Sequence, residues 1–376
     1  MQKLTQFPVP ELEILDEIYI TIAVDLVSES TTQDKNRIQL SNCLNEAESK
    51  LESLEDQELV AKFNKQIDEV RKHLRELITH RGGLVLFITA DDIYYYHLNN
   101  PTKDLLDIGL LPNFKPLIEN YQFSNNYHLL VLSQEAFELF EGNHENIRRI
   151  EIDDEDAPVD LETALGTEKT GGELNHGTFG SRGSGAPQTF HGHNETSAEK
   201  DIDRENYFRI VDKYIYDNYS LPESTPLILY ALSENQNIFR NLTKNQFLLD
   251  EGINESGNKM SQQEIEKKTI AKHDEIIEHE KENILTTFRE TTPEYRIDNH
   301  LDDLASSAIQ GRINELIINR SFKQNGSINS DGLYQEDDNN FLKQIVARTI
   351  QTGGTVYLFD SEELPEEINM SARLRY

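Results

Sequence analysis

Side chains that could act on a phosphate or an ester lie close together in one stretch of this sequence. They are Arg182, Gln188, His191 and His193. An arginine binds phosphate through several N–H donors, a glutamine can orient a water molecule by hydrogen bonds, and a histidine moves protons near neutral pH. We therefore expect Gln188, His191 and His193 to be catalytic and Arg182 to contact RNA.

The same stretch is unusual in its glycine and acid content. Residues 166–200 hold eight of the 19 glycines, and residues 174–194 contain no acidic residue although the chain has 68. Glycine lets backbone N–H groups approach a phosphate, and missing carboxylates remove repulsion from a polyanion. We expect Gly183 and Gly185 to bind RNA with Arg182.

Two other interpretations of this loop remain open. A glycine-rich, weakly apolar stretch is also typical of a tether that forms no core. The three histidines His176, His191 and His193 could bind a metal ion, but a third ligand from such a loop has no geometric support in the sequence. The prediction is therefore that no metal is bound, and no Walker loop or other cofactor motif is present.

Periodic patterns predict the elements that must position this loop. Apolar residues recur at steps of three and four in several stretches, which indicates amphipathic helices. The expected helices are 40–54, 60–78, 201–215, an exposed connector at 264–288, 301–309 and 341–350. Short runs of β-branched and aromatic residues predict strands, and the strands 84–88 and 93–97 are expected to form a hairpin with a tight turn at Asp91-Asp92. The expected strands are 19–24, 84–88, 93–97, 128–132, 136–140, 147–152, 226–231, 312–318 and 355–359.

Composition limits the classes of function. The 376 residues carry 36 Lys and Arg against 68 Asp and Glu, a net charge of −32. This acidic balance argues against a chain that coats nucleic acid, DNA included, because phosphate contacts need cations. The single cysteine excludes an internal disulfide, and no apolar run reaches the ~20 residues that span a bilayer. We expect a cytoplasmic protein with no membrane contact.

Three motifs, in this order, resemble one family. The first is Thr32-Gln33-Asp34-Lys35-Asn36-Arg37-Ile38-Gln39-Leu40-Ser41-Asn42-Cys43-Leu44-Asn45-Glu46-Ala47-Glu48. The second is a meandering sheet, the glycine- and histidine-rich loop with Phe190-His191-Gly192-His193, and a helix from Asp203. The third is Leu304-Ala305-Ser306-Ser307-Ala308-Ile309-Gln310-Gly311-Arg312-Ile313-Asn314-Glu315-Leu316-Ile317. Together they are similar to the bacterial members of the archaeo-eukaryotic peptide chain release factor superfamily, relatives of the class-1 termination factors and of pelota.

The resemblance implies a mixed α/β (α+β) fold of three domains. They would be an N-terminal α/β domain at 1–80, a middle domain at 81–260 with a ribonuclease H-like sheet and the loop 166–200, and a connector helix with a ribosomal-protein-like α/β/α sandwich at 261–376.

The resemblance also implies a release or ribosome-rescue type of translation factor. Its partners would be the ribosome and peptidyl-tRNA, reached through the loop. The classical loop carries Gly-Gly-Gln, whereas here Gly171-Gly172 is followed by Glu173. The sequence therefore leaves open whether the chain is an enzyme. The alternative is a non-catalytic module that keeps the architecture and binds a protein or an RNA.

Overall fold

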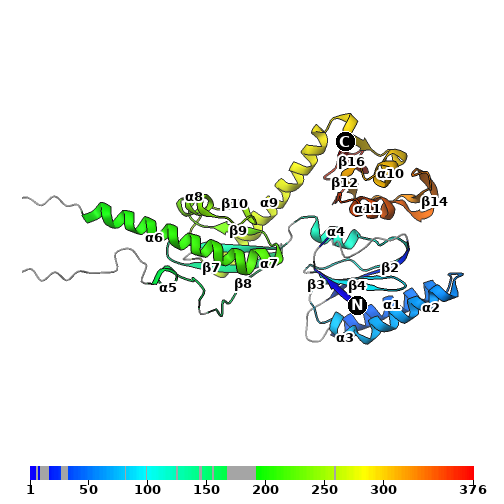
Figure 1. The fold of residues 1–376 in the computed structure, drawn as a ribbon, viewed down its shortest axis with the longest axis horizontal. Helices are drawn as coiled ribbons and strands as arrows, with labels where there is room; N and C mark the ends of the chain where they lie inside the picture. The colour runs from blue at the N-terminus through cyan, green and yellow to red at the C-terminus, as the bar shows by residue number, and fades with distance from the viewer. Residues whose placement is uncertain are drawn as a thin grey trace, which may run out of the picture. The chain divides into compact units, whose positions relative to one another are not determined.

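The structure is a computed structural model (Figure 1) that describes residues 1–5, 7–8, 17–26, 33–80, 82–98, 100–123, 126–143, 146–154, 156–166, 192–257 and 260–376. The chain forms two compact units. Unit 1 comprises Met1–Phe123 and Glu280–Tyr376, and unit 2 comprises Ser124–His279. Unit 2 is thus an insertion in the sequence of unit 1.

The N-terminal part of unit 1 is a five-stranded sheet with three helices on one face. The strand order is β1-β4-β3-β2-β5. The elements are β1 (Gln2–Leu4), β2 (Ile18–Leu26), α1 (Gln33–Leu51), α2 (Gln57–Lys72), α3 (Leu74–Leu77), β3 (Gly82–Ile88), β4 (Ile93–Leu98), β5 (Leu105–Leu110) and α4 (Lys115–Tyr121). Strand β2 pairs antiparallel with β3, with Ile22 opposite Leu86. Both strands are almost wholly buried because both faces of the sheet are covered.

Alternation along β2 divides the side chains between two cores. Ile20, Ile22 and Val24 pack with the apolar stripes of α1 and α2, whereas Tyr19 and Ala23 point to the opposite face. That second face packs against apolar residues of the C-terminal segment. The N- and C-terminal parts of the chain therefore share one continuous core.

The C-terminal part of unit 1 is a four-stranded sheet in the order β11-β16-β12-β15, with a separate hairpin β13-β14. The elements are η3 (Pro293–Tyr295), β11 (Arg296–Asp298), α10 (Leu301–Ile309), β12 (Ile313–Asn319), β13 (Asn325–Ile328), β14 (Tyr334–Asn340), α11 (Phe341–Gln351), β15 (Thr355–Phe359) and β16 (Met370–Leu374). Strands β12 and β15 are parallel and are connected through α11. Gly311, between α10 and β12, has a φ of +67°, where a side chain would be strained.

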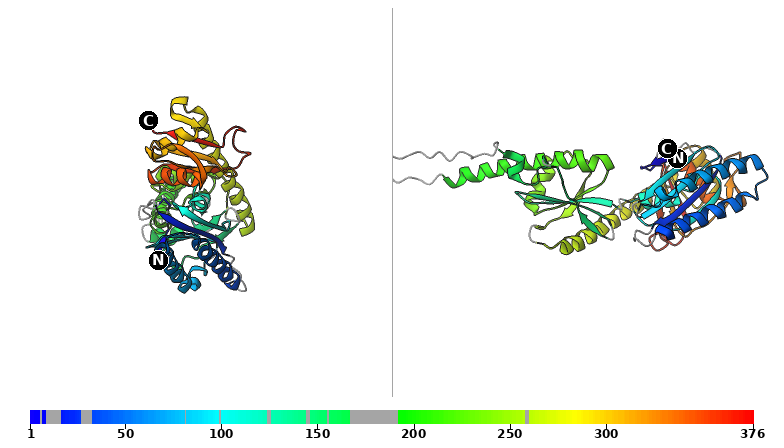
Figure 2. Two further views of the ribbon diagram at one scale, coloured as in Figure 1. Left: turned by 90° about the vertical axis from the view of Figure 1, so that its right-hand side faces the viewer. Right: turned by 90° about the horizontal axis from the view of Figure 1, so that it is seen from below.

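Unit 2 is a five-stranded sheet in the order β10-β9-β6-β7-β8. The elements are β6 (Asn126–Leu132), β7 (Phe137–Asn143), β8 (Ile147–Arg149), α5 (Leu161–Leu165), α6 (Gly192–Ile215), η2 (Tyr216–Ser220), α7 (Leu221–Glu223), β9 (Leu227–Tyr230), α8 (Ser233–Leu242), β10 (Leu248–Ile253) and α9 (Gln262–Glu290), whose last residues belong to unit 1. Leu130 and Leu132 of β6 face α5, α6 and α8, whereas Leu129 and Val131 face α9. Figure 2 shows α6 and α9 on opposite sides of this sheet.

The expected mixed α/β class is confirmed, but two elements lie elsewhere than expected. The hairpin β3-β4 belongs to the same sheet as β2 rather than to the sheet of unit 2. The physical reason is that β3 is buried on both faces and completes its ladder with β2. This sheet crosses the boundary expected at residue 80, and the three-domain division stays a prediction.

The second difference is α9, which is not merely an exposed connector. Ile265 is 2% exposed and packs with the sheet of unit 2, and the His273 ring lies 4.4 Å from that of Tyr127. No helix in the described ranges is both long and apolar enough to cross a membrane.

Candidate functional site

Most of the loop residues predicted to be functional lie outside the residues that the structure describes. Arg182, Gly183, Gly185, Gln188 and His191 fall outside the described residues, as does His176. His193 falls within the bounds of α6, but its side chain is not among those described. Their predicted roles in catalysis and RNA binding therefore stay predictions.

The elements on either side of residues 167–191 are fixed to the same face of the unit 2 sheet. Helix α5 ends at Leu165, and Leu161 and Leu165 share a core with Tyr207 and Phe208 of α6. Asp160 caps α5 by accepting a hydrogen bond from the Thr163 N–H at 2.8 Å. The chain therefore leaves the sheet on α5 and returns to the same layer on α6.

Buried polar contacts hold α6 in place. The Arg204 side chain is 9% exposed and donates to Asp201 at 2.8 Å and to Glu234 at 2.9 Å. Asp212 accepts hydrogen bonds from the Thr243 hydroxyl and, at 2.8 Å, from the Lys244 N–H. An ion bonded on several sides is costly to disrupt when it is buried. These contacts fix the part of α6 around Arg204 and Asp212, which follows residues 167–191 in the sequence.

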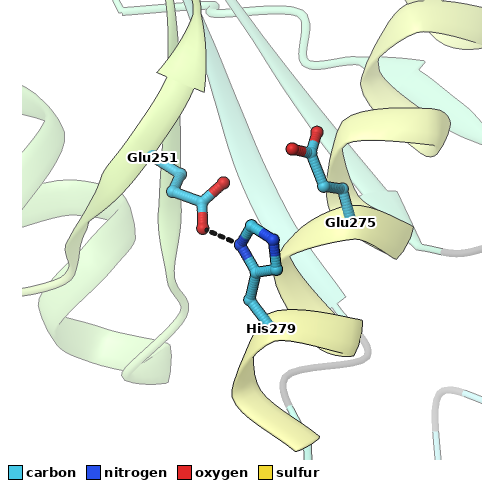
Figure 3. A group of neighbouring side chains, drawn as sticks. All are labelled: Glu251, Glu275 and His279. Carbon is cyan, nitrogen blue, oxygen red and sulfur yellow. Dashed lines mark hydrogen bonds and ion pairs between the residues drawn. The ribbon is translucent and has the colours of Figure 1, made fainter. Parts of the chain in front are cut away.

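A second cluster of titratable side chains lies on the other face of the same sheet. Glu251 on β10 and Glu275 and His279 on α9 place one potential ligand atom each within 4.8 Å of one another (Figure 3). The spacing of four between Glu275 and His279 puts both on one face of the helix. Glu251 Oε1 lies 2.8 Å from Nδ1 of His279.

Lys272 completes this cluster. Its Nζ lies 2.5 Å from Glu251 Oε2 and 3.0 Å from Glu275 Oε2. The hydrogen bonds from Lys272 and His279 lower the pKa of Glu251, and the bond to Glu251 raises the pKa of His279. Burial opposes the charge of Lys272, but its bonds to Glu251 and Glu275 outweigh that cost and raise its pKa.

The cluster as it stands is an ion-pair network rather than an open metal site. Two carboxylates and one imidazole are a suitable ligand set for a divalent cation. The Lys272 ammonium, however, bonds to both carboxylates, so a metal ion would have to displace it. Sequence reasoning missed the cluster because only the Glu275–His279 spacing is local, whereas Glu251 comes from a separate strand.

Comparison with known proteins identifies the segment that carries these features. Residues 125–279 match the model of the family described as bacterial archaeo-eukaryotic release factor family 6. No curated protein matches the chain.

Similar solved structures include three proteins of archaeal origin. A structure described only as an archaeal protein has 11% identity and a TM-score of 0.26, covering 95% of this chain and 92% of its own. An archaeal translation termination factor has 10% identity and a TM-score of 0.24, covering 97% and 93%. Pelota of Archaeoglobus fulgidus has 12% identity and a TM-score of 0.26, covering 78% and 79%. The family match confirms the resemblance inferred from the sequence for one segment: residues 125–279 are similar to the bacterial archaeo-eukaryotic release factor-like family.

Proposed function

We propose that this protein is a cytoplasmic translation factor of the release or ribosome-rescue type, which acts on the ribosome through residues 166–200. The family match supports the proposal because it spans this segment together with the sheet and helices on both sides of it. The ribosome is the expected partner, and peptidyl-tRNA is the expected target of the loop.

The observation that carries the proposal is the attachment of the segment. It begins after α5 and ends in α6, and both helices share one core on one face of the sheet. The segment itself has eight glycines, and residues 174–194 have no acid, in a chain with a net charge of −32. The acid-free stretch lies between two helices that pack on the same sheet. It is suited to contact RNA because it adds no negative charge, whereas the acidic rest of the chain repels the phosphates.

Individual residues then have distinct roles. Gly183 and Gly185 allow close backbone approach, and Arg182 donates to a phosphate. Gln188 orients a water molecule against the peptidyl-tRNA ester, and His191 or His193 transfers the proton. Because Glu173 follows Gly171-Gly172, the water-orienting group would have to be Gln188 rather than the glutamine of a Gly-Gly-Gln motif.

The test measures binding and hydrolysis separately. We expect deletion of residues 174–194 to abolish co-sedimentation with ribosomes at low salt, and Arg182→Ala to weaken it. Arg75→Ala, an exposed arginine on α3, is the matched control and should bind as the unmodified protein does. Gln188→Ala should retain ribosome binding and lose cleavage of peptidyl-tRNA.

Three results would change the proposal in different ways. If Gln188→Ala and the deletion leave cleavage of peptidyl-tRNA unchanged, the loop is not catalytic. If binding depends on the loop but no cleavage occurs with any form, the protein is the non-catalytic interaction module. If the full chain does not co-sediment with ribosomes at low salt, the ribosome is not its partner.

A further inference from the structure

Unit 1 contains a cavity that the proposed function does not use. Its volume is about 420 Å³, and it lies between α4 with the residues before it, the end of β12, and the start of α11. Small-molecule sites in proteins usually have volumes of about 300–1,000 Å³. The cavity is therefore large enough for a ligand the size of a mononucleotide.

Cations are concentrated on the wall of this cavity. Lys115, Arg320, Lys323 and Lys343 line it, against Asp338 as the one acidic lining residue. In the whole chain, by contrast, acidic residues outnumber basic ones by 68 to 36. A reversal of the charge ratio on one concave surface favours a ligand with negative charge.

Two of these cations have no charge partner of their own. Lys115 and Lys323 are exposed, and neither makes an ion pair within 4.0 Å among the described residues. Lys115 Nζ does donate a hydrogen bond to the Arg320 carbonyl at 3.3 Å, which leaves its charge without an acidic partner. Lys343 differs, since its side chain is 7% exposed and its Nζ lies 2.9 Å from Asp107. Arg320 is paired as well, since its Nε lies 3.7 Å from Glu119 Oε1 and its Nη1 lies 3.5 Å from Asp360 Oδ1. The cations of this wall without a carboxylate partner among the described residues are therefore Lys115 and Lys323. The cavity thus keeps positive groups that internal pairing does not satisfy.

Amide side chains add uncharged donors to the wall. Asn113 Oδ1 accepts from the Lys115 N–H at 3.2 Å, Asn319 Oδ1 from the Ser321 N–H at 3.0 Å, and Asn340 Oδ1 from the Lys343 N–H at 3.2 Å. Because a backbone N–H fixes each oxygen, the orientation of each amide is determined by the hydrogen bonds. The three NH₂ groups make no hydrogen bond within the described part of the chain, so the cavity has an excess of donors.

The rest of the wall is apolar. Phe114, Phe322, Leu342 and Val346 are among the lining residues. A ligand that matches the cations, the amide donors and the apolar side chains of this wall has negatively charged acceptor oxygens, further polar atoms that can accept hydrogen bonds from amides, and a flat or apolar part. A phosphorylated nucleoside combines these groups in about the available volume.

We propose that this cavity binds a nucleoside monophosphate. The phosphate lies against Lys115 and Lys323 and accepts from the free amide donors, and the base packs on the apolar side that includes Phe322. The same chemistry is present in a free mononucleotide and in the terminal nucleotide of an RNA strand.

The experiment titrates the full chain with defined probes by calorimetry. The probes are the four ribonucleoside monophosphates, the matching nucleosides, inorganic phosphate, and a short oligoribonucleotide with a 5′-phosphate. We expect at least one monophosphate or the oligonucleotide to bind, and its phosphate-free form to bind at least about tenfold more weakly, since hydrogen bonds to a charged group contribute most of the specificity. Binding of a monophosphate assigns the free nucleotide as the source, and binding of the oligonucleotide alone assigns a strand end.

Matched variants test the site itself. The double variant Lys115→Ala/Lys323→Ala should weaken binding at least about tenfold, whereas Lys62→Ala/Lys65→Ala on α2 changes the net charge equally and should have no effect. Asn319→Asp keeps the acceptor for the Ser321 N–H, replaces the NH₂ donor with a charged oxygen, and should also weaken binding. Circular dichroism verifies that each variant is folded.

The proposal is overturned by any of three outcomes. No probe binds, the nucleoside binds as tightly as its monophosphate, or the Lys62/Lys65 pair lowers affinity as much as the Lys115/Lys323 pair. None of these outcomes depends on the ribosome, so the assay separates this proposal from the proposed function in translation.

Discussion

Glu251 connects two cations on one helix, and its effect on stability should depend on pH. The pKa of His279 is raised above its ordinary 6.5 by the bond to Glu251, and the pKa of Glu251 is lowered below its ordinary 4.5 by Lys272 and His279. The contribution of His279 to the free energy of unfolding is complete at a pH below its pKa in the unfolded chain, and it is lost as the pH rises through its pKa in the folded protein. The contribution of Glu251 to the free energy of unfolding is complete at a pH above its pKa in the unfolded chain, and it is lost as the pH falls through its pKa in the folded protein.

Glu251→Gln should therefore destabilise unit 2 most between about pH 4.5 and 6.5, and less above that range. Urea unfolding across this range gives the free energy of unfolding, and NMR titration should show the pKa of His279 falling towards its ordinary value. Glu282→Gln, an exposed acid with no bonded partner among the described residues, is the control. An unchanged His279 titration in Glu251→Gln would show that the pair does not form in solution.

Helix α9 illustrates how a packed element can be hidden in a sequence. Its buried positions include Thr269 and His273 beside Ile265, so the apolar stripe is interrupted and the pattern is typical of an exposed helix. Thr269 satisfies its hydroxyl by donating to the Ile265 carbonyl at 2.7 Å, which allows a polar residue at a core position.

Ile265→Ala should lower the free energy of unfolding by about 2–5 kcal/mol, because it leaves a cavity against the unit 2 sheet. Ile210→Ala on α6 is the matched control, and since Ile210 is 37% exposed its loss should be much smaller. Denaturant unfolding measures both. Equal small losses in the two variants would mean that α9 does not pack on this sheet.

Elements with a strong local pattern could be predicted, and elements defined by distant partners could not. The apolar stripes of α1 and α2 and the pattern of the hairpin β3-β4 each lie within a short stretch of sequence, and the structure confirms these elements. Strand β14 reads Tyr-Gln-Glu-Asp-Asp-Asn-Asn and has no apolar alternation, so only its pairing with β13 makes it a strand. The pairing of β3 with β2 joins residues far apart in the sequence, and no local signal specifies it.

The same distinction applies to the candidate sites. The loop residues stand out from sequence because their composition differs from the chain around them. The wall of the unit 1 cavity combines Leu105 and residues 113–118 with residues 318–325, residues 338–346 and Leu358, which are separated by about 200 residues of sequence. Such a site becomes visible only after folding has brought both ends of the chain into one core.

At the scale of the whole molecule, the charge distribution predicts how ribosome binding responds to salt. If this chain of net charge −32 contacts RNA through the proposed loop, which has one arginine in its acid-free stretch, it neutralises few phosphates. Co-sedimentation should therefore fall by less than about tenfold between 50 and 200 mM salt, since the slope follows the number of phosphates neutralised.

The measurement is a ribosome-binding titration at several salt concentrations, with Arg182→Ala for comparison. That variant should bind more weakly and show a still shallower slope. A loss of about a thousandfold over the same range would require many cationic contacts and would place the RNA-binding surface outside the loop.

The insertion of unit 2 within unit 1 has a consequence for synthesis of the protein. Residues 124–279 are contiguous and contain a complete sheet with helices on both faces, whereas the core shared by Tyr19 and Phe341 needs both ends of the chain. At translation rates of about 5–20 residues per second, the remaining chain takes roughly 10 to 50 seconds to follow residue 123. During that interval the N-terminal sheet presents an apolar face with no covering layer, so a nascent chain of this protein is a natural client for a chaperone that shields such surfaces.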